Sequence, residues 1–83
     1  MNSTIINQED ALKWFAELFG LPVASLSPTT PRTEIQTWDS LGVLTLMAAL
    51  DETFNLVVDD ADMRAMQKVG DVLDLLRKHG KFT

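Results

Sequence analysis

The chain contains no cysteine among its 83 residues, so neither a disulfide nor a cysteine-ligated zinc site can hold it together. Its single histidine, His79, lies near the C-terminus. We expect that imidazole to meet a helix end or solvent, since no Ser–His–Asp arrangement is available for catalysis. A chain of this length predicts one small domain, residues 1–83, with a limited core that depends on helix packing.

Long apolar segments are also missing. The N-terminal sequence MNSTIINQED has no basic region followed by an apolar run, which a secretory signal peptide requires. The longest apolar stretch, residues 41–50, holds about ten residues, whereas a membrane-spanning helix takes about 20. We therefore expect a soluble, cytoplasmic protein without membrane insertion.

Basic side chains are scarce, with 7 Lys and Arg against 12 Asp and Glu and a net charge of −5. Nucleic-acid phosphates repel such a chain, so we expect no nucleic-acid partner, and positively charged protein surfaces are favoured instead. The aspartates of residues 59–62 lack the glycine and the distal glutamate of a calcium loop, and no glycine-rich phosphate loop is present. We therefore expect a protein that is not an enzyme.

Helical periodicity is what the sequence does contain. A first helix is predicted to follow Asn7, a capping residue with Asp10 three positions on, and to end at Gly20. Its inner face consists of apolar residues at helical spacing: Leu12, Phe15, Leu18 and Phe19. Residues 20–38 then form a long loop with three prolines. We expect apolar side chains to anchor this loop to the core: Leu21, Val23, Leu26 and Ile35.

The second predicted helix, residues 40–54, carries two apolar stripes, although a surface helix needs only one. The first is predicted to face the core: Val43, Leu46, Met47, Leu50 and Phe54. The second is shorter: Leu41, Leu44 and Ala48. The acidic residues Asp51 and Glu52 lie near the C-terminal end, where the helix dipole disfavours anions. This placement indicates that these acids serve something besides helix stability.

The remaining segments complete an all-α fold. Residues 56–58 are predicted to form a buried connector, followed by a short third helix at residues 59–66 with Met63 and Met66 facing inward. A fourth helix is predicted at residues 69–78 and ends before Gly80. Its inner face is formed by four apolar residues: Val69, Val72, Leu73 and Leu76.

The second helix opens with Asp39-Ser40-Leu41, and alone this motif is ordinary helix capping. Its context is a long loop before it, an apolar helix after it, and a small acidic four-helix chain around it. In that context residues 5–78 resemble the acyl carrier protein family. The segment DSLGVLTLMAALDETF looks like the family's modification site and second helix, and LVVDDADMRAMQKVGDVLDLL looks like its connector, short third helix and fourth helix.

The resemblance implies an acyl-carrier-like four-helix bundle, expected to be a monomer, that carries 4′-phosphopantetheine on Ser40. A separate magnesium-dependent phosphopantetheinyl transferase would donate the group from coenzyme A. Asp39 matches the acid that helps the transferase hold its metal, or it is only a charge at the helix start. The arm ends in a thiol that carries an acyl or aminoacyl group as a thioester, presented to loading and transferring enzymes.

The resemblance also assigns a partner-facing side to the second helix. Leu41, Leu44 and Ala48 would contact partner enzymes, or else add to the core. Asp51 and Glu52 match acids that meet basic patches, or else they are solvated helix residues. Met63 would border the acyl group as part of the partner-binding set, or else fill the core.

The chain departs from typical fatty-acid carriers at three places. Those carriers hold acids two and five residues after the serine, where this chain has Gly42 and Thr45. These departures and the form WDSLG favour a stand-alone carrier of a specialised pathway over a housekeeping fatty-acid carrier. Lys68 replaces the usual Ser or Thr cap and is expected to loosen the start of the fourth helix. Trp38 is expected to pack under the loop rather than beside the arm. The reading from another class is a helical protein-interaction module without a prosthetic group, in which Ser40 is only a cap.

Overall fold

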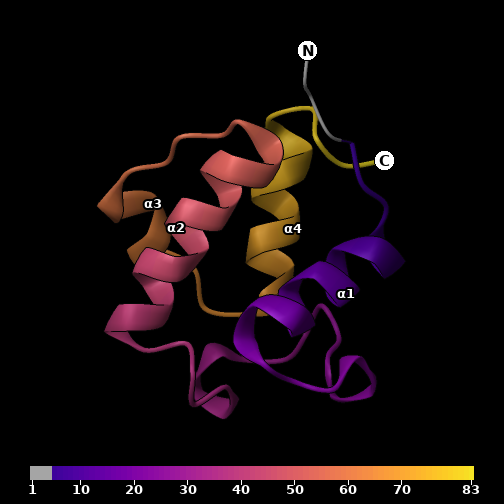
Figure 1. Ribbon diagram of the computed structural model, residues 1–83, viewed down its shortest axis with the longest axis vertical. Helices are drawn as coiled ribbons and strands as arrows, with labels where there is room; N and C mark the ends of the chain where they lie inside the picture. Colours follow the sequence, from indigo (N-terminus) through magenta and orange to yellow (C-terminus); the bar gives the residue numbers. More distant parts are fainter. Residues whose placement is uncertain (1–4) are drawn as a thin grey trace.

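The computed structural model describes residues 5–83 and forms a bundle of helices (Figure 1). Two short 3₁₀ turns, η1 (Val23–Ser25) and η2 (Arg32–Glu34), interrupt the loop after the first helix. No strand occurs in the described residues, so the all-α prediction is confirmed there. Four α-helices lie within them, three longer and one short: α1 (Gln8–Phe19), α2 (Ser40–Phe54), α3 (Asp60–Arg64) and α4 (Val69–Lys78). None of these helices is long and apolar enough to cross a membrane.

Local signals set both ends of α1. The Asn7 side chain accepts a hydrogen bond of 2.8 Å from the Asp10 backbone N–H, which satisfies one of the amides that a helix start leaves without a partner. Gly20 ends the helix in the left-handed conformation with φ 68°, and its N–H donates to the Ala16 carbonyl. Glycine reaches this conformation without the steric cost that a Cβ adds. The predicted start and end of the first helix are therefore confirmed.

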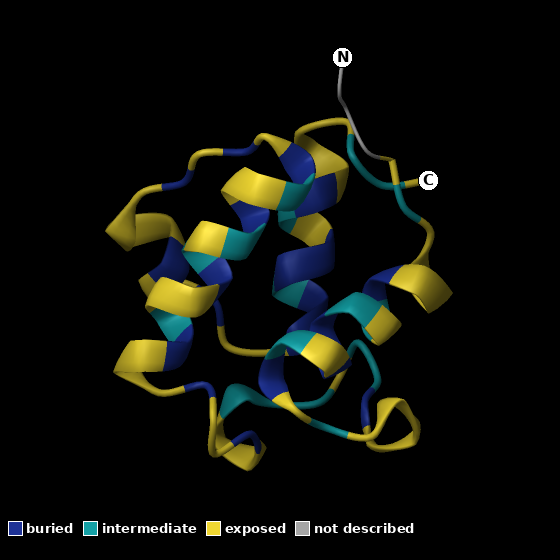
Figure 2. Cartoon of the chain, in the orientation of Figure 1, coloured by how far each residue is buried: buried dark blue, intermediate teal, exposed yellow. Residues whose placement is uncertain are grey.

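One core lies between the helices and continues under the long loop (Figure 2). Its aromatic centre joins α1 to the loop, because the Trp38 ring centroid lies 5.2 Å from that of Phe15 and 5.9 Å from that of Phe19. From α2 three predicted core residues are buried: Leu46, Leu50 and Phe54. Four other residues assigned to inner faces are only half-buried, but they pack against the core as predicted: Leu12, Leu18, Val43 and Met47.

The long loop packs against the start of α4 rather than merely linking α1 to α2. Leu26 and Ile35 are buried as predicted, while Val23 is 42% exposed and was wrongly assigned as an anchor. Backbone hydrogen bonds join the loop to the segment before α4: Arg32 N–H donates to the Gln67 carbonyl at 2.7 Å. The loop carbonyls of Thr30 and Pro28 accept from the first two amides of α4, at 3.0 and 2.8 Å.

The start of α4 is therefore firmly held, and the expected loosening at Lys68 is wrong. Besides the loop carbonyls, the Asp71 carboxylate accepts hydrogen bonds from the backbone N–H groups of Gln67 (2.7 Å) and Lys68 (3.2 Å). The Lys68 ammonium also donates to Asp71, at 3.1 Å. The bond from Gln67, followed by the contacts with Lys68, lowers the pKa of Asp71 against an opposing contribution from burial.

Helix α2 ends as predicted, but the segment from α2 to α4 differs from the prediction in two details. Asn55 ends α2 in the left-handed conformation, with φ 54°. Leu56 and Val58 are buried, but Val57 between them is 81% exposed because extended residues alternate sides, so the connector is only partly buried. The short helix α3 ends at Arg64, two residues before the predicted end, because the chain turns to pair with the loop at residues 67 and 68.

The two ends of the described chain meet. Ile6 donates from its N–H to the Lys81 carbonyl and accepts from the Thr83 N–H, both at 2.9 Å. The Arg77 guanidinium lies 4.9 Å from the Phe82 ring centroid. Gly80, with φ 74°, turns the chain after α4 toward this contact, as its predicted place after the last helix requires.

Candidate functional site

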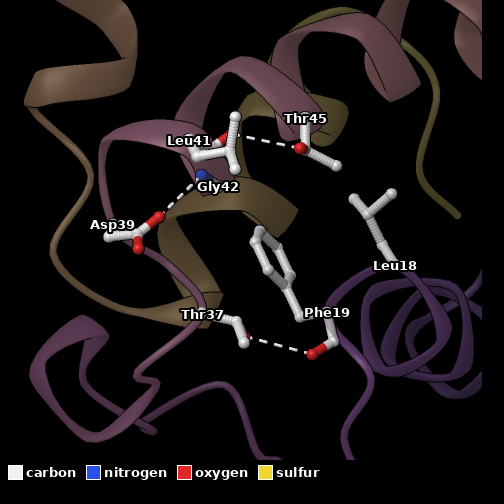
Figure 3. A pocket seen from close by; sticks show the side chains of 7 residues that line it. All are labelled: Leu18, Phe19, Thr37, Asp39, Leu41, Gly42 and Thr45. Carbon is white, nitrogen blue, oxygen red and sulfur yellow. Dashed lines mark hydrogen bonds between the residues drawn. The ribbon is translucent and has the colours of Figure 1, made fainter.

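Ser40 is the first residue of α2, but it is not the residue that caps the helix. The cap is Asp39, whose Oδ1 accepts a hydrogen bond of 2.9 Å from the Gly42 backbone N–H (Figure 3). Ser40 is exposed, and its hydroxyl takes part in no hydrogen bond within residues 5–83. The interpretation of Ser40 as only a helix cap is therefore wrong, since the neighbouring carboxylate has that role.

The start of α2 offers a favourable position for an anion. A helix N-terminus carries backbone N–H groups without helical partners and the positive end of the helix dipole. The first turn of this 15-residue helix contains no acidic residue. A negatively charged group on the Ser40 hydroxyl would therefore be favoured by the helix, although the Asp39 carboxylate already accepts from the Gly42 N–H of that turn.

Two shallow cavities flank this helix start. The first, of about 250 Å³, lies between the end of α1 and the start of α2 (Figure 3), and its lining is partly apolar and partly polar: Leu18, Phe19, Thr37, Asp39, Leu41, Gly42 and Thr45. The second, of about 350 Å³, lies between the long loop, α2 and α3, and contains the serine: Arg32, Ser40, Val43, Leu44, Asp60 and Arg64. Ser40 thus belongs to the cavity on the α3 side of α2.

Gly42 is buried where the loop passes close to α2. A Cβ at this position would lie 2.1 Å from the Thr37 carbonyl oxygen and 3.0 Å from the Phe19 ring. Thr37 is itself held in place, because its hydroxyl donates to the Phe19 carbonyl at 3.1 Å (Figure 3). A side chain of any kind at residue 42 therefore collides with backbone, which gives a steric reason for the missing acid.

The second stripe of α2 is exposed, and the alternative that it adds to the core is wrong. Leu41 is 70% exposed and Leu44 61%, and Ala48 is exposed as well. Asp51 and Glu52 are also exposed, one helical turn further on. Because residues spaced by three and four share one helix face, these five residues form a continuous stripe that starts beside Ser40. We call it the α2 stripe.

Met63 does not belong to this surface. Its side chain has no exposed area and lies in the core with Met66, which is 4% exposed. Its burial leaves it no surface for contact with a partner enzyme and agrees with the core-filling alternative, while its place beside the acyl group stays a prediction. Trp38 is 3% exposed and packs under the loop, as expected.

Two arginines of the Ser40 cavity, Arg32 and Arg64, were not predicted from the sequence. Arg32 begins the 3₁₀ turn η2. It is half-buried, its Nε donates to the Trp38 carbonyl at 3.3 Å, and its guanidinium lies 5.5 Å from the Trp38 ring centroid. The one available signal was its isolation, since no other Lys or Arg occurs between residues 13 and 64. Arg64 approaches the same cavity from α3, where its Nη2 lies 2.7 Å from the Asp60 carboxylate.

The chain matches no known protein-family model.

Proposed function

We propose that this protein is a carrier of the acyl carrier type, with 4′-phosphopantetheine attached to Ser40. The observation that carries the proposal is that the helix cap and the exposed hydroxyl at the start of α2 belong to two different residues. Asp39 caps the helix, while the Ser40 hydroxyl is exposed and takes part in no hydrogen bond within residues 5–83. A serine that is neither buried nor needed as a cap is free to be esterified without cost to the helix.

The surrounding residues fit a phosphate ester. The amide groups at the start of α2 favour an anion, and Arg32 and Arg64 line the cavity that contains Ser40. Attachment would join the Ser40 Oγ to phosphorus as the phosphoanhydride bond of coenzyme A breaks, with adenosine 3′,5′-bisphosphate leaving and the hydroxyl proton passing to a base of the transferase. When bound, the arm supplies a thiol that holds an acyl or aminoacyl group as a thioester.

Asp39 is suited to a second task beside capping. Only its Oδ1 takes part in a hydrogen bond within the described part of the chain, and the residue is exposed. The other carboxylate oxygen is therefore accessible to the magnesium ion of a transferase, since carboxylate oxygens are the ligands this ion prefers.

The α2 stripe is the proposed contact surface for partner enzymes. Its half nearest Ser40 is apolar and its distal half is acidic, so it offers apolar contact beside the attachment point and charge attraction further away. Without acids at residues 42 and 45, the apolar contact dominates near the serine. This arrangement favours a dedicated partner in a specialised pathway over the general fatty-acid elongation enzymes.

Intact mass spectrometry tests the attachment. The protein is incubated with coenzyme A and a broad-specificity phosphopantetheinyl transferase, and we expect a mass increase of one phosphopantetheine. Ser40→Ala should show no increase, whereas the matched variant Ser25→Ala, which removes another exposed hydroxyl, should be modified like the wild type. An unchanged wild-type mass, or an increase that persists in Ser40→Ala, would leave only the protein-interaction module.

A second assay separates the two kinds of carrier. Purified fatty-acid elongation enzymes are given the modified protein and a typical fatty-acid carrier at equal concentration. We expect much slower turnover on this protein. Equal turnover would refute the specialised pathway and leave the housekeeping carrier.

A further inference from the structure

Arginine side chains gather near Ser40, although the chain as a whole is acidic. The protein has only 7 basic residues and a net charge of −5. It contains three arginines, Arg32, Arg64 and Arg77, and two of these line the cavity that contains Ser40. The same cavity holds one carboxylate, that of Asp60, so its lining carries a net positive charge.

The two arginines are held in different ways. Arg32 is fixed by the loop, because its Nε donates to the Trp38 carbonyl and its guanidinium lies over the buried Trp38 ring. Its two terminal nitrogens have no hydrogen-bond partner within residues 5–83. Arg64 is 80% exposed and engages Asp60 through Nη2. One guanidinium is thus preorganised with free donors, and the other is tethered by an exposed ion pair of the kind that contributes little energy.

We propose that Arg32 and Arg64 form a binding site for the phosphate that Ser40 carries. This inference rests on the proposed attachment at Ser40 and adds the residues that position the arm. Guanidinium groups bind phosphate oxygens through paired, charge-assisted hydrogen bonds. Arg32 supplies the fixed contact, and Arg64 exchanges its bond to Asp60 for one to the phosphate. The phosphate is then held on the α3 side of α2, away from the cavity beside Leu18.

The experiment compares apo and modified protein for each variant. The measured quantity is the increase in melting temperature on modification, which cancels any effect of a substitution on the apo protein. We expect an increase in the wild type, a smaller one in Arg32→Gln and in Arg64→Gln, and none in the double variant. Arg77→Gln removes the same charge at the far end of α4 and should retain the full increase. Salt at about 1 M, where the screening length is about 3 Å, should reduce the wild-type increase.

Asp60→Asn gives a test of opposite sign. Without the carboxylate Arg64 has no competing partner, so modification should raise the melting temperature more than in the wild type. The ³¹P resonance of the attached phosphate should also move in Arg32→Gln and Arg64→Gln but not in Arg77→Gln.

The two proposals fail in distinguishable ways. If Ser40 is not modified, the mass measurement refutes the carrier function itself. If Ser40 is modified but the temperature increase and the ³¹P resonance are the same in Arg32→Gln, Arg64→Gln and Arg77→Gln, the arginine site is refuted and the carrier function stands. Should Arg32→Gln fail to fold, Arg64→Gln and Asp60→Asn still decide, since neither touches Trp38.

Discussion

Gly42→Ala adds a single methyl group where the long loop passes close to α2. The backbone N–H of residue 42 is retained, so the hydrogen bond to the Asp39 carboxylate survives the substitution. The new Cβ would lie 2.1 Å from the Thr37 carbonyl oxygen, whereas ordinary contact begins at 3.4 Å. The carbonyl must therefore retreat by about 1.3 Å, against the bond from the Thr37 hydroxyl to Phe19 and the packing of Trp38 next to it.

Two opposing contributions set the size of the effect. Inserting a methyl into a well-packed site raises the energy of the folded state by about 1–3 kcal/mol. Replacing glycine by alanine in a helix stabilises the folded state by at most about 1 kcal/mol. We expect a net loss of about 1–2 kcal/mol in the free energy of unfolding, and in a domain of this size that lowers the melting temperature by roughly 5–15 °C.

Urea unfolding followed by tryptophan fluorescence measures this loss, with Gly20→Ala as the comparison. At Gly20 nothing lies within 4 Å of an added Cβ, so only its left-handed backbone, φ 68°, resists alanine. That variant should lose about 1–2 kcal/mol through the backbone alone. A Gly42→Ala protein at least as stable as the wild type would show that the loop yields freely, and the steric reason for glycine at residue 42 would be lost.

Four further outcomes follow from the same geometry. Asp39→Ala should lower the free energy of unfolding by about 1 kcal/mol, while Ser40→Ala should change it by less than about 0.5 kcal/mol; equal losses in urea unfolding would mean that the serine shares the cap. The pKa of Asp71 is lowered below its ordinary value of 3.8, so its stabilisation is present above that value and is lost as the pH falls through the folded-state pKa. Asp71→Asn should therefore flatten the stability profile below about pH 5, and an unchanged acid limb would contradict this. Leu41→Ser should leave stability within about 0.5 kcal/mol yet slow transfer to the partner enzyme, whereas Leu46→Ala should lose about 2–5 kcal/mol; a large stability loss in Leu41→Ser would place that residue in the core. Thr45→Glu should fold normally, because residue 45 is exposed, and should increase turnover by fatty-acid elongation enzymes; unchanged turnover would remove charge as the reason for partner choice.

Local signals allowed much of the fold to be predicted. The bounds of α2 and α4 agree with the prediction, and so does the cap of α1 at Asn7. These signals are capping residues, glycines at helix ends and apolar spacing. They involve residues within about one helical turn of each other, so they can be recognised in a single sequence. The resemblance implied that Leu41 and Leu44 face a partner, with core packing as the alternative, and both side chains are exposed.

The features that escaped prediction depend on contacts between distant segments. The early end of α3 comes from the loop, which pairs with residues 67–70 from some 40 positions earlier in the chain. The firm start of α4 depends on this pairing together with the local hydrogen bonds to Asp71. Arg32 enters the Ser40 cavity by the same route. Neither the loop contacts nor the position of Arg32 has a periodic or capping pattern in the sequence. The groups that these residues contact are backbone carbonyls and cavity walls from distant parts of the chain.

The two positions where this chain lacks the acids of fatty-acid carriers now have different explanations. At residue 42 the Thr37 carbonyl leaves no room for a side chain, so the absence of charge follows from how closely the loop packs on α2. At residue 45 the side chain is exposed, and its hydroxyl only donates back to the Leu41 carbonyl at 3.0 Å. Glutamate would fit there without any change in packing. Packing therefore accounts for the first absence alone, and under the proposed function a choice of partner would depend on residue 45.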